Sequence, residues 1–201
     1  MAKPLLFGRM EIGRVYNIKP SAISNNWVYK GILAYEDAVI VSGKPVWPGG
    51  LVIALALPPG SRGRQLDEQA LVALEEEQKA VVRPMKRGEL PPLVGAQEYG
   101  ELFGVSEYTV SSAALSGSGQ MPAPDYELSG SMVWLLDTVL AHAPKTMEMS
   151  RKKIWVLRDG VAAALSGGRY DGPGSFFSQR GNKARPSPET DAAASAASPR
   201  R

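Results

Sequence analysis

The chain has no cysteine and only one histidine, His142, among its 201 residues. Disulfides, thiolate nucleophiles and cysteine-ligated zinc sites are therefore excluded, and a histidine metal cluster is impossible. No run of 18 uncharged apolar residues occurs, and the first residues lack the apolar core of a signal peptide. We expect a cytoplasmic protein without a membrane partner.

Sequence motifs of common enzymes are also missing. There is no phosphate-binding Gly-x-x-x-x-Gly-Lys-Ser/Thr, and the segment 116–119 (Ser-Gly-Ser-Gly) lacks the order of a Gly-x-Ser-x-Gly nucleophile elbow. We interpret that segment as a turn, and Glu98 and Glu101 as solvated positions on a helix. The sequence predicts a protein that is not an enzyme and holds no cofactor or metal.

Positive charge is absent from one long part of the chain. Residues 89–144 contain seven acidic residues and no Lys or Arg, so they carry −7. Residues 1–57 carry +3, residues 58–88 carry +1 and residues 145–201 carry +6, which together give the net charge of +3. The charge is thus segregated along the sequence.

Hydrophobic residues make up 44% of the chain, which is enough for packed cores. They are not evenly spread, because residues 167–201 consist mainly of Gly, Ser, Pro, Ala and Arg. Such a segment has too few large apolar groups to offset the loss of chain entropy on folding. We predict a disordered basic tail over residues 167–201.

The sequence repeats itself at an offset of 87 residues. Residues 4–56 (copy 1) match residues 91–143 (copy 2) without a gap, and 13 of the 53 positions are identical. Composition alone would give roughly three or four identities, so we interpret the match as a duplication. The identical pairs are Pro4/Pro91, Leu6/Leu93, Gly8/Gly95, Glu11/Glu98, Gly13/Gly100, Ser24/Ser111, Ser42/Ser129, Gly43/Gly130, Val46/Val133, Trp47/Trp134, Val52/Val139, Ala54/Ala141 and Ala56/Ala143.

Turn and capping residues divide each copy into two helices. In copy 2, residues 96–103 predict a first helix that ends at Gly104, and Ser106 caps a second helix over residues 107–115. In copy 1 the first helix is expected over residues 10–16, with Asn17 in the place of the glycine. Pro20 then opens a second helix over residues 20–28, where its missing N–H costs nothing.

An alternating segment and a third helix follow in each copy. Residues 39–47 and 126–134 each predict a two-stranded hairpin around Ser-Gly, and third helices are expected over residues 51–57 and 138–143. A small helical bundle with a hairpin is the alternative. Residues 154–159 and 161–165 are interpreted as an extra strand and helix on copy 2.

Residues 58–90 form the connection. A helix is expected over residues 66–82, either packed on one copy or pairing as a short coiled coil; the stripe of apolar residues is too short to favour the second option. The predicted domains are residues 1–57, this linker, residues 91–166, and the tail.

One segment of copy 2 carries a family resemblance: residues 94–106, Val-Gly-Ala-Gln-Glu-Tyr-Gly-Glu-Leu-Phe-Gly-Val-Ser. It is followed by Met-Pro-Ala-Pro (121–124), Leu-Ser-Gly (128–130), Val-Trp (133–134) and Asp137. This pattern resembles the MerR-like and excisionase-like winged helix-turn-helix families of actinobacteria and their phages. The resemblance covers about 50 residues in each copy. It implies a mainly α fold class with small β-hairpin wings: two tandem winged helix-turn-helix domains joined by a linker helix.

The resemblance also implies a function. We expect a nucleoid-associated protein that binds specific sequences of double-stranded DNA, as a transcriptional regulator or repressor. An excisionase-like recombination directionality factor is the alternative with the same fold, and an interaction adaptor with degenerate modules is the alternative of another class. The second helix of such a domain lies in the major groove and the wing lies beside it.

The candidate DNA-binding residues follow from these positions. Copy 1 offers Lys19, Ser21, Ser24, Asn25 and Lys30 from the second helix and Lys44 from the hairpin. Copy 2 offers Tyr108, Ser111 and Ser112, with Arg151, Lys152 and Lys153 as a possible source of phosphate contacts. Because copy 2 is acidic, it can instead serve as a surface for a homodimer or for a protein partner. Trp27 is expected to pack the second helix of copy 1 on the core.

Overall fold

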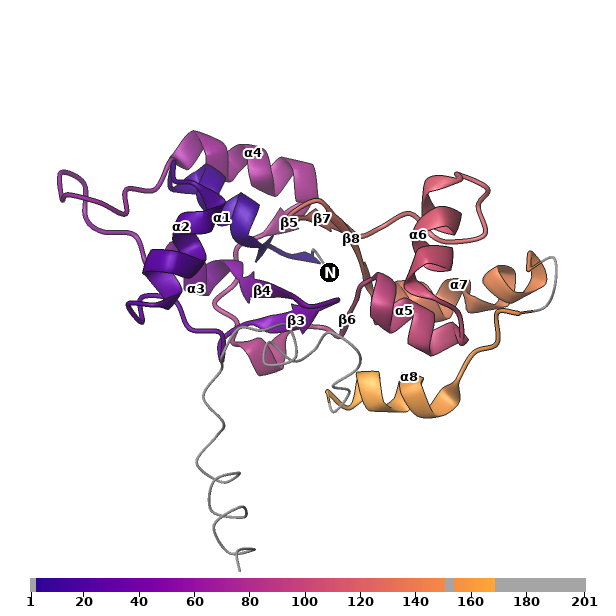
Figure 1. Ribbon diagram of the computed structural model, residues 1–201. Helices are drawn as coiled ribbons and strands as arrows, with labels where there is room; N and C mark the ends of the chain where they lie inside the picture. Colours follow the sequence, from indigo (N-terminus) through magenta and orange to yellow (C-terminus); the bar gives the residue numbers. More distant parts are fainter. Residues whose placement is uncertain (1–2, 151–153, 169–201) are drawn as a thin grey trace, which may run out of the picture.

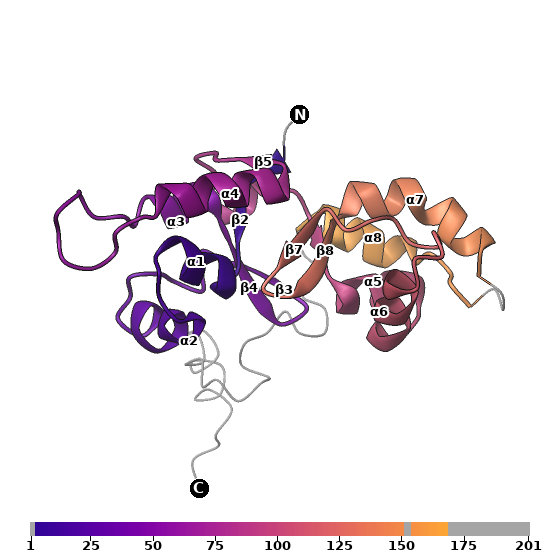
Figure 2. The same ribbon diagram turned by 90° about the horizontal axis from the view of Figure 1, so that it is seen from above.

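The computed structural model describes residues 3–150 and 154–168. Figures 1 and 2 show the two copies side by side, with their β-hairpins meeting in the middle of the molecule. Of the described residues, 45% are helical and 15% lie in strands, and the strands form three small sheets. The molecule is therefore a mixed α/β protein.

Copy 1 builds a three-stranded antiparallel sheet and short helices. Its strands are β2 (Leu6–Phe7), β3 (Val39–Val41) and β4 (Lys44–Pro48), in the order β2-β4-β3. Its helices are α1 (Arg9–Val15), α2 (Pro20–Ala22) and α3 (Gly49–Ile53). A π-helical segment, η1 (Ile23–Val28), continues α2. The second helix of this copy thus spans the expected residues but winds more widely after Ala22.

Copy 2 repeats this order. Its strands are β6 (Leu93–Val94), β7 (Tyr126–Leu128) and β8 (Ser131–Leu135), in the order β6-β8-β7. Its helices are α5 (Ala96–Phe103), α6 (Glu107–Leu115) and α7 (Leu136–Glu148). Helices α5 and α6 have the predicted bounds, because Gly104 adopts φ 68° at the end of α5 and the Ser106 side chain accepts a hydrogen bond from the Thr109 N–H.

The fold class predicted from the sequence is wrong. A mainly α, tandem winged helix-turn-helix fold is not identified, because the described residues form a mixed α/β structure with three sheets. The strands β2 and β6 were missed, since two residues are too few to show an alternating pattern. Each pairs with the hairpin of its own copy, Phe7 opposite Trp47 and Val94 opposite Trp134, so the hairpins are parts of sheets rather than free wings.

The third helix of copy 2 is longer than expected. The prediction ended it at Ala143, yet α7 continues to Glu148 through Pro144, a residue that disfavours a helix interior. Pro144 is exposed, whereas Ala143 and Thr146 are buried. Packing of the buried face therefore offsets the hydrogen bond that proline cannot donate.

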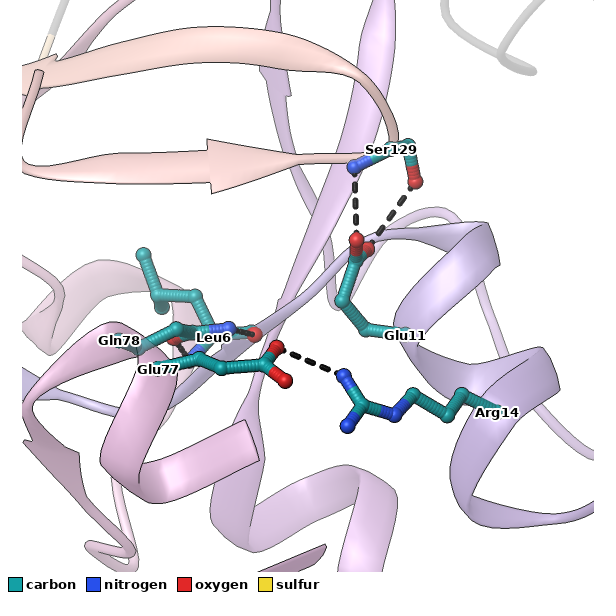
Figure 3. A network of polar contacts seen from close by, with 6 residues as sticks. All are labelled: Leu6, Glu11, Arg14, Glu77, Gln78 and Ser129. Carbon is teal, nitrogen blue, oxygen red and sulfur yellow. Dashed lines mark hydrogen bonds and ion pairs between the residues drawn. The ribbon is translucent and has the colours of Figure 1, made fainter. Parts of the chain in front are cut away.

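The connection between the copies packs on copy 1. Helix α4 (Glu68–Gln78) leads into β5 (Ala80–Val81), which pairs in parallel with β1 (Lys3–Pro4), and a 3₁₀ turn, η2 (Arg87–Glu89), precedes copy 2. The buried Gln78 side chain donates to the Leu6 carbonyl at 2.8 Å and accepts from the Leu6 N–H at 3.1 Å. The amide thereby completes the free edge of β2, as Figure 3 shows.

After residue 153 the chain returns to copy 2. Val156 and Arg158 donate their backbone N–H groups to the carbonyls of Phe103 and Leu102 at the end of α5, and α8 (Asp159–Ser166) follows. No strand is assigned over residues 154–159, although one was expected there. Trp155 is buried against Tyr99 and Phe103, which anchors this segment.

Candidate nucleic-acid face and the interface between the copies

The second helix of copy 1 is fixed to the core through one side. Ile23 and Trp27 are buried, and the Trp27 ring meets the Tyr16 ring edge-on with centroids 4.8 Å apart. The expectation that Trp27 packs this helix on the core is confirmed. The opposite side, which we call the α2–η1 face, consists of the exposed residues Lys19, Ser21, Asn25, Asn26, Tyr29 and Lys30.

Ser24 does not belong to the α2–η1 face. Its hydroxyl is buried, whereas the neighbouring Asn25 and Asn26 are exposed. The two asparagines carry both donors and acceptors on their side-chain amides, and Tyr29 is 86% exposed. Sequence reasoning did not select Asn26 and Tyr29; the available signal for Asn26 was the polar run 24–26 (Ser-Asn-Asn).

The stretch of chain that carries this face contains no acidic residue. From Ile12 to Tyr35 the sequence contains three cations and no Asp or Glu. One cation, Arg14, is paired with Glu77 of α4 at 2.6 Å, with both side chains about half exposed (Figure 3). The α2–η1 face therefore carries Lys19 and Lys30 without a nearby carboxylate in the same stretch of chain.

The corresponding surface of copy 2 has a different chemistry. In α6, Tyr108, Ser112 and Leu115 are exposed at helical spacing, and Tyr108 and Leu115 are each 79% exposed, while Ser111 is partly buried. Residues 99–122, which match 12–35, contain Glu101 and Glu107 and no cation. Arg151, Lys152 and Lys153, the expected basic neighbours, lie outside the described residues.

The tip of the copy 2 hairpin docks on the first helix of copy 1. The Glu11 carboxylate accepts hydrogen bonds from the Ser129 N–H at 2.8 Å and the Ser129 hydroxyl at 3.1 Å, and it also accepts from the Gly8 N–H at 2.9 Å. In turn the Met10 N–H donates to the Ser129 hydroxyl oxygen at 3.1 Å. Figure 3 shows Glu11 pointing from α1 to Ser129 at the hairpin turn.

The tip of the copy 1 hairpin makes the same contacts with copy 2. The Glu98 carboxylate accepts from the Ser42 N–H at 2.9 Å, from the Ser42 hydroxyl at 2.7 Å and from the Gly95 N–H at 3.1 Å. The Gln97 N–H donates to the Ser42 hydroxyl oxygen at 3.0 Å. We call the two sets the reciprocal Ser–Glu contacts. They involve positions that are identical in the two copies.

The backbone conformation of the two hairpin turns suits these contacts. Ser42 and Gly43 have φ angles of 46° and 73°, and Ser129 and Gly130 have 49° and 70°. Two consecutive residues with positive φ between paired strands define a two-residue turn whose twist matches the strands. Serine is an unusual choice for its first position, and in both copies its hydroxyl and N–H are bound by the glutamate of the other copy.

Lys44 lies at this interface. Its ammonium group donates to the Ser131 hydroxyl and, at 3.3 Å, to the Ser129 carbonyl, both in the hairpin of copy 2. The sequence placed Lys44 on a free wing beside DNA. The structure instead places it between the two hairpins, away from the α2–η1 face on the second helix.

Apolar packing continues the interface. Tyr126, Leu128 and Val133 from the copy 2 sheet belong to the same buried cluster as the core of copy 1. The Tyr126 hydroxyl donates to the Pro4 carbonyl at 3.0 Å, and burial raises the pKa of this tyrosine well above its ordinary value. The two copies thus form one continuous body.

Burial distinguishes the two glutamates. Glu98 is only 3% exposed, whereas Glu11 is partly exposed. The pKa of the Glu98 carboxyl is raised because burial penalises its charged form, and the hydrogen bonds from Ser42 and Gly95 oppose this effect only in part.

The raised pKa of Glu98 predicts a pH-dependent stability. The folded protein holds this proton more tightly than the unfolded chain, so the contribution is complete below the ordinary pKa of 4.5 and is lost as pH rises through the raised value. In urea titrations, the wild type should lose unfolding free energy relative to Glu98→Gln as the pH rises from 4.5 through the raised pKa of Glu98. The exposed Glu107→Gln is the control, and a difference that does not vary with pH would refute the prediction.

Neither a metal site nor a membrane span is present in the described part of the chain. No group of three or more His, Asp or Glu side chains there could hold a metal ion, and none of its helices has the length and apolar character needed to cross a bilayer. The comparisons with known proteins found no matching family model, no similar curated protein and no similar solved structure.

Proposed function

We propose that the chain binds double-stranded DNA through the α2–η1 face of copy 1 and acts as a transcriptional regulator. The observation that carries this proposal is the composition of that face. It combines two lysines, two asparagines and an exposed tyrosine, and no acidic residue occurs between Ile12 and Tyr35.

The chemistry of these side chains fits a nucleic acid. A duplex carries one negative charge per ~1.7 Å of its axis, and Lys19 and Lys30 would neutralise phosphates. Asn25 and Asn26 offer the paired donor and acceptor that match the edge of adenine in the major groove. The helix is held to the core by Ile23 and Trp27, so these groups would be presented on a rigid support.

The positions of the second helices support binding from one side. In Figure 2, α2 and α6 lie on the same side of the molecule, and α4 and α7 lie on the opposite side. A duplex that lies against α2 would therefore pass on the side of α6. Since residues 89–144 carry −7, we assign the sequence-reading contacts to copy 1 alone.

Copy 2 supports a second candidate function, the binding of a protein partner. Tyr108 and Leu115 form an exposed apolar pair on α6, and the nearest charged side chain of this helix is Glu107. A segment with basic and apolar side chains would complement this surface. A chain that binds no duplex at low salt would favour such an adaptor role over the first proposal.

A salt titration with a random duplex tests DNA binding. We expect the full chain to bind at low salt and to lose affinity steeply as salt rises, because bound lysines release counterions from phosphates. Lys19→Gln with Lys30→Gln should weaken binding to every sequence and flatten the logarithmic salt slope by about 2, one for each phosphate contact. Fluorescence anisotropy with labelled duplex measures both quantities.

The control for this experiment removes two cations elsewhere. Lys79→Gln with Lys145→Gln causes the same loss of charge at exposed sites at the end of α4 and within α7, opposite α2 in Figure 2. If both double variants flatten the slope equally, binding depends on total charge and the assignment to the α2–η1 face is wrong.

A further inference from the structure

The interface between the copies is self-complementary. Each copy presents the same two parts: a Ser-Gly hairpin tip that donates, and the first turn of a helix whose glutamate accepts. The hairpin of copy 1 binds the helix of copy 2, and the hairpin of copy 2 binds the helix of copy 1. Such reciprocity is characteristic of a two-fold symmetric interface between identical subunits, in which one surface patch binds another copy of itself.

The glycines before the two helices fit the same interpretation. A Cβ atom on Gly8 would lie 2.3 Å from the Ser129 hydroxyl oxygen, and a Cβ on Gly95 would lie 2.3 Å from the Ser42 hydroxyl oxygen. Both glycines have negative φ angles, −90° and −98°, which any residue can adopt. Glycine is therefore favoured here by the close approach of the other copy and not by the backbone conformation. Gly8, Glu11, Ser42 and Gly43 are all identical in copy 2. The duplication has preserved the interface.

A short exposed segment joins the two halves. Residues 84–89 run from β5, which belongs to copy 1, to the start of copy 2, and all of them except Met85 are exposed. The one side-chain hydrogen bond described between this segment and residues 3–57 runs from Arg87 to the Glu36 carbonyl at 3.4 Å, and Pro84 lies close to Gly50. Few contacts other than the interface itself therefore hold residues 84–89 against copy 1.

We propose that the partner of this interface is a second copy of this chain, bound by exchange. In the exchanged dimer, the hairpin tip of copy 1 docks on α5 of another chain, and the copy 2 hairpin of that chain docks on α1 of the first. The contacts are the same within one chain and between two chains. The equilibrium between monomer and exchanged dimer therefore depends on the local concentration of the two copies and on the path of residues 84–89. This proposal does not depend on DNA binding.

Shortening the connection tests the exchange. Deleting residues 85–88 reduces the reach of the chain by roughly 13 Å, since an extended residue spans at most about 3.3 to 3.6 Å. We expect that the copies then no longer meet within one chain. We expect light scattering after gel filtration to give twice the monomer mass, with the helical circular dichroism retained.

Two matched pairs of variants test the route of association. Ser42→Asp with Ser129→Asp places a carboxylate against Glu98 and Glu11, and Ser42→Asn with Ser129→Asn keeps the size without the charge; both Asp and Asn tolerate positive φ. In the shortened chain the Asp pair should restore the monomer mass, and the Asn pair should leave the dimer. A shortened chain that stays monomeric overturns the proposal, and so does a shortened chain that remains dimeric when it carries the Asp pair.

The unshortened chain provides a second measurement if the deletion prevents folding. Refolding from urea at rising protein concentration should give an increasing fraction of dimer, and the Asp pair should reduce that fraction relative to the Asn pair. Because the chain has no cysteine, single cysteines in place of the exposed Glu68 and Asp137 can carry a donor and an acceptor dye on separate chains. Only monomer at every concentration, with no energy transfer, overturns the proposal.

Discussion

The free energy of unfolding is expected to fall by about 3 to 5 kcal/mol when either Trp47 or Trp134 is replaced by alanine, the range for truncating a large buried aromatic residue. Both rings are fully buried, and both lie in the central strand of their sheet. Their indole N–H groups both donate to backbone carbonyls, that of Trp47 to Ala34 at 2.8 Å and that of Trp134 to Pro122 at 3.0 Å, at sites one position apart in the repeat. Urea denaturation measures the change.

The two losses should be of similar size, because the two positions are equivalent in the duplication. A phenylalanine at either position is the matched control, since it keeps an aromatic ring and removes only the hydrogen bond and part of the volume. A Trp134→Ala variant as stable as the wild type would contradict the equivalence of the two sheets.

Gly8→Ala is expected to destabilise the protein by about 1 to 3 kcal/mol, the usual cost of overpacking. The new methyl group would lie 2.3 Å from the Ser129 hydroxyl oxygen, 2.7 Å from the Glu11 carboxylate and 3.2 Å from the Ser129 Cβ, so the hydrogen bonds between Ser129 and Glu11 must rearrange. Chemical denaturation of the full chain gives the magnitude.

A double-mutant cycle separates this effect from a local one in copy 1. Ser129→Gly removes the hydroxyl that the methyl group meets and suits the positive φ at this position. Combined with Gly8→Ala, it should recover part of the loss, so the two changes should not be additive. Strict additivity would show that Gly8 matters within copy 1 and not at the interface.

Much of the secondary structure could be predicted from single residues. Gly104 and Ser106 define the end of α5 and the start of α6, because a left-handed glycine and a serine cap act locally. Asn17 has φ 50° and ends the first helix of copy 1 in the place of the glycine, as expected. These features depend on neighbours in sequence and are therefore visible in it.

The arrangement of the hairpins could not be predicted in the same way. Glu98 was interpreted as a solvated helix residue, yet it is buried against Ser42, which lies 56 residues away. The repeat did contain a signal, because Gly8, Glu11, Ser42 and Gly43 are identical in the two copies although only 13 of 53 positions are. The sequence alone does not say whether such positions are retained for the fold of each copy or for the contact between them.

The division of charge has a structural counterpart. The copies have the same order of elements and the same reciprocal contacts, so their common positions serve folding and association. They differ on the exposed side of the second helix, which carries Lys19 and Lys30 in copy 1 and Glu107 in copy 2. The difference in net charge between the copies is therefore expressed at the surface proposed to meet DNA.

The comparison of the two charge-matched double variants tests the proposed function most directly. The affinity for a random duplex should fall, and the salt slope should flatten by about 2, in Lys19→Gln with Lys30→Gln, while Lys79→Gln with Lys145→Gln should retain nearly the wild-type slope. Equal slopes in the two variants, or a wild-type chain without measurable binding at low salt, would contradict DNA binding through the α2–η1 face.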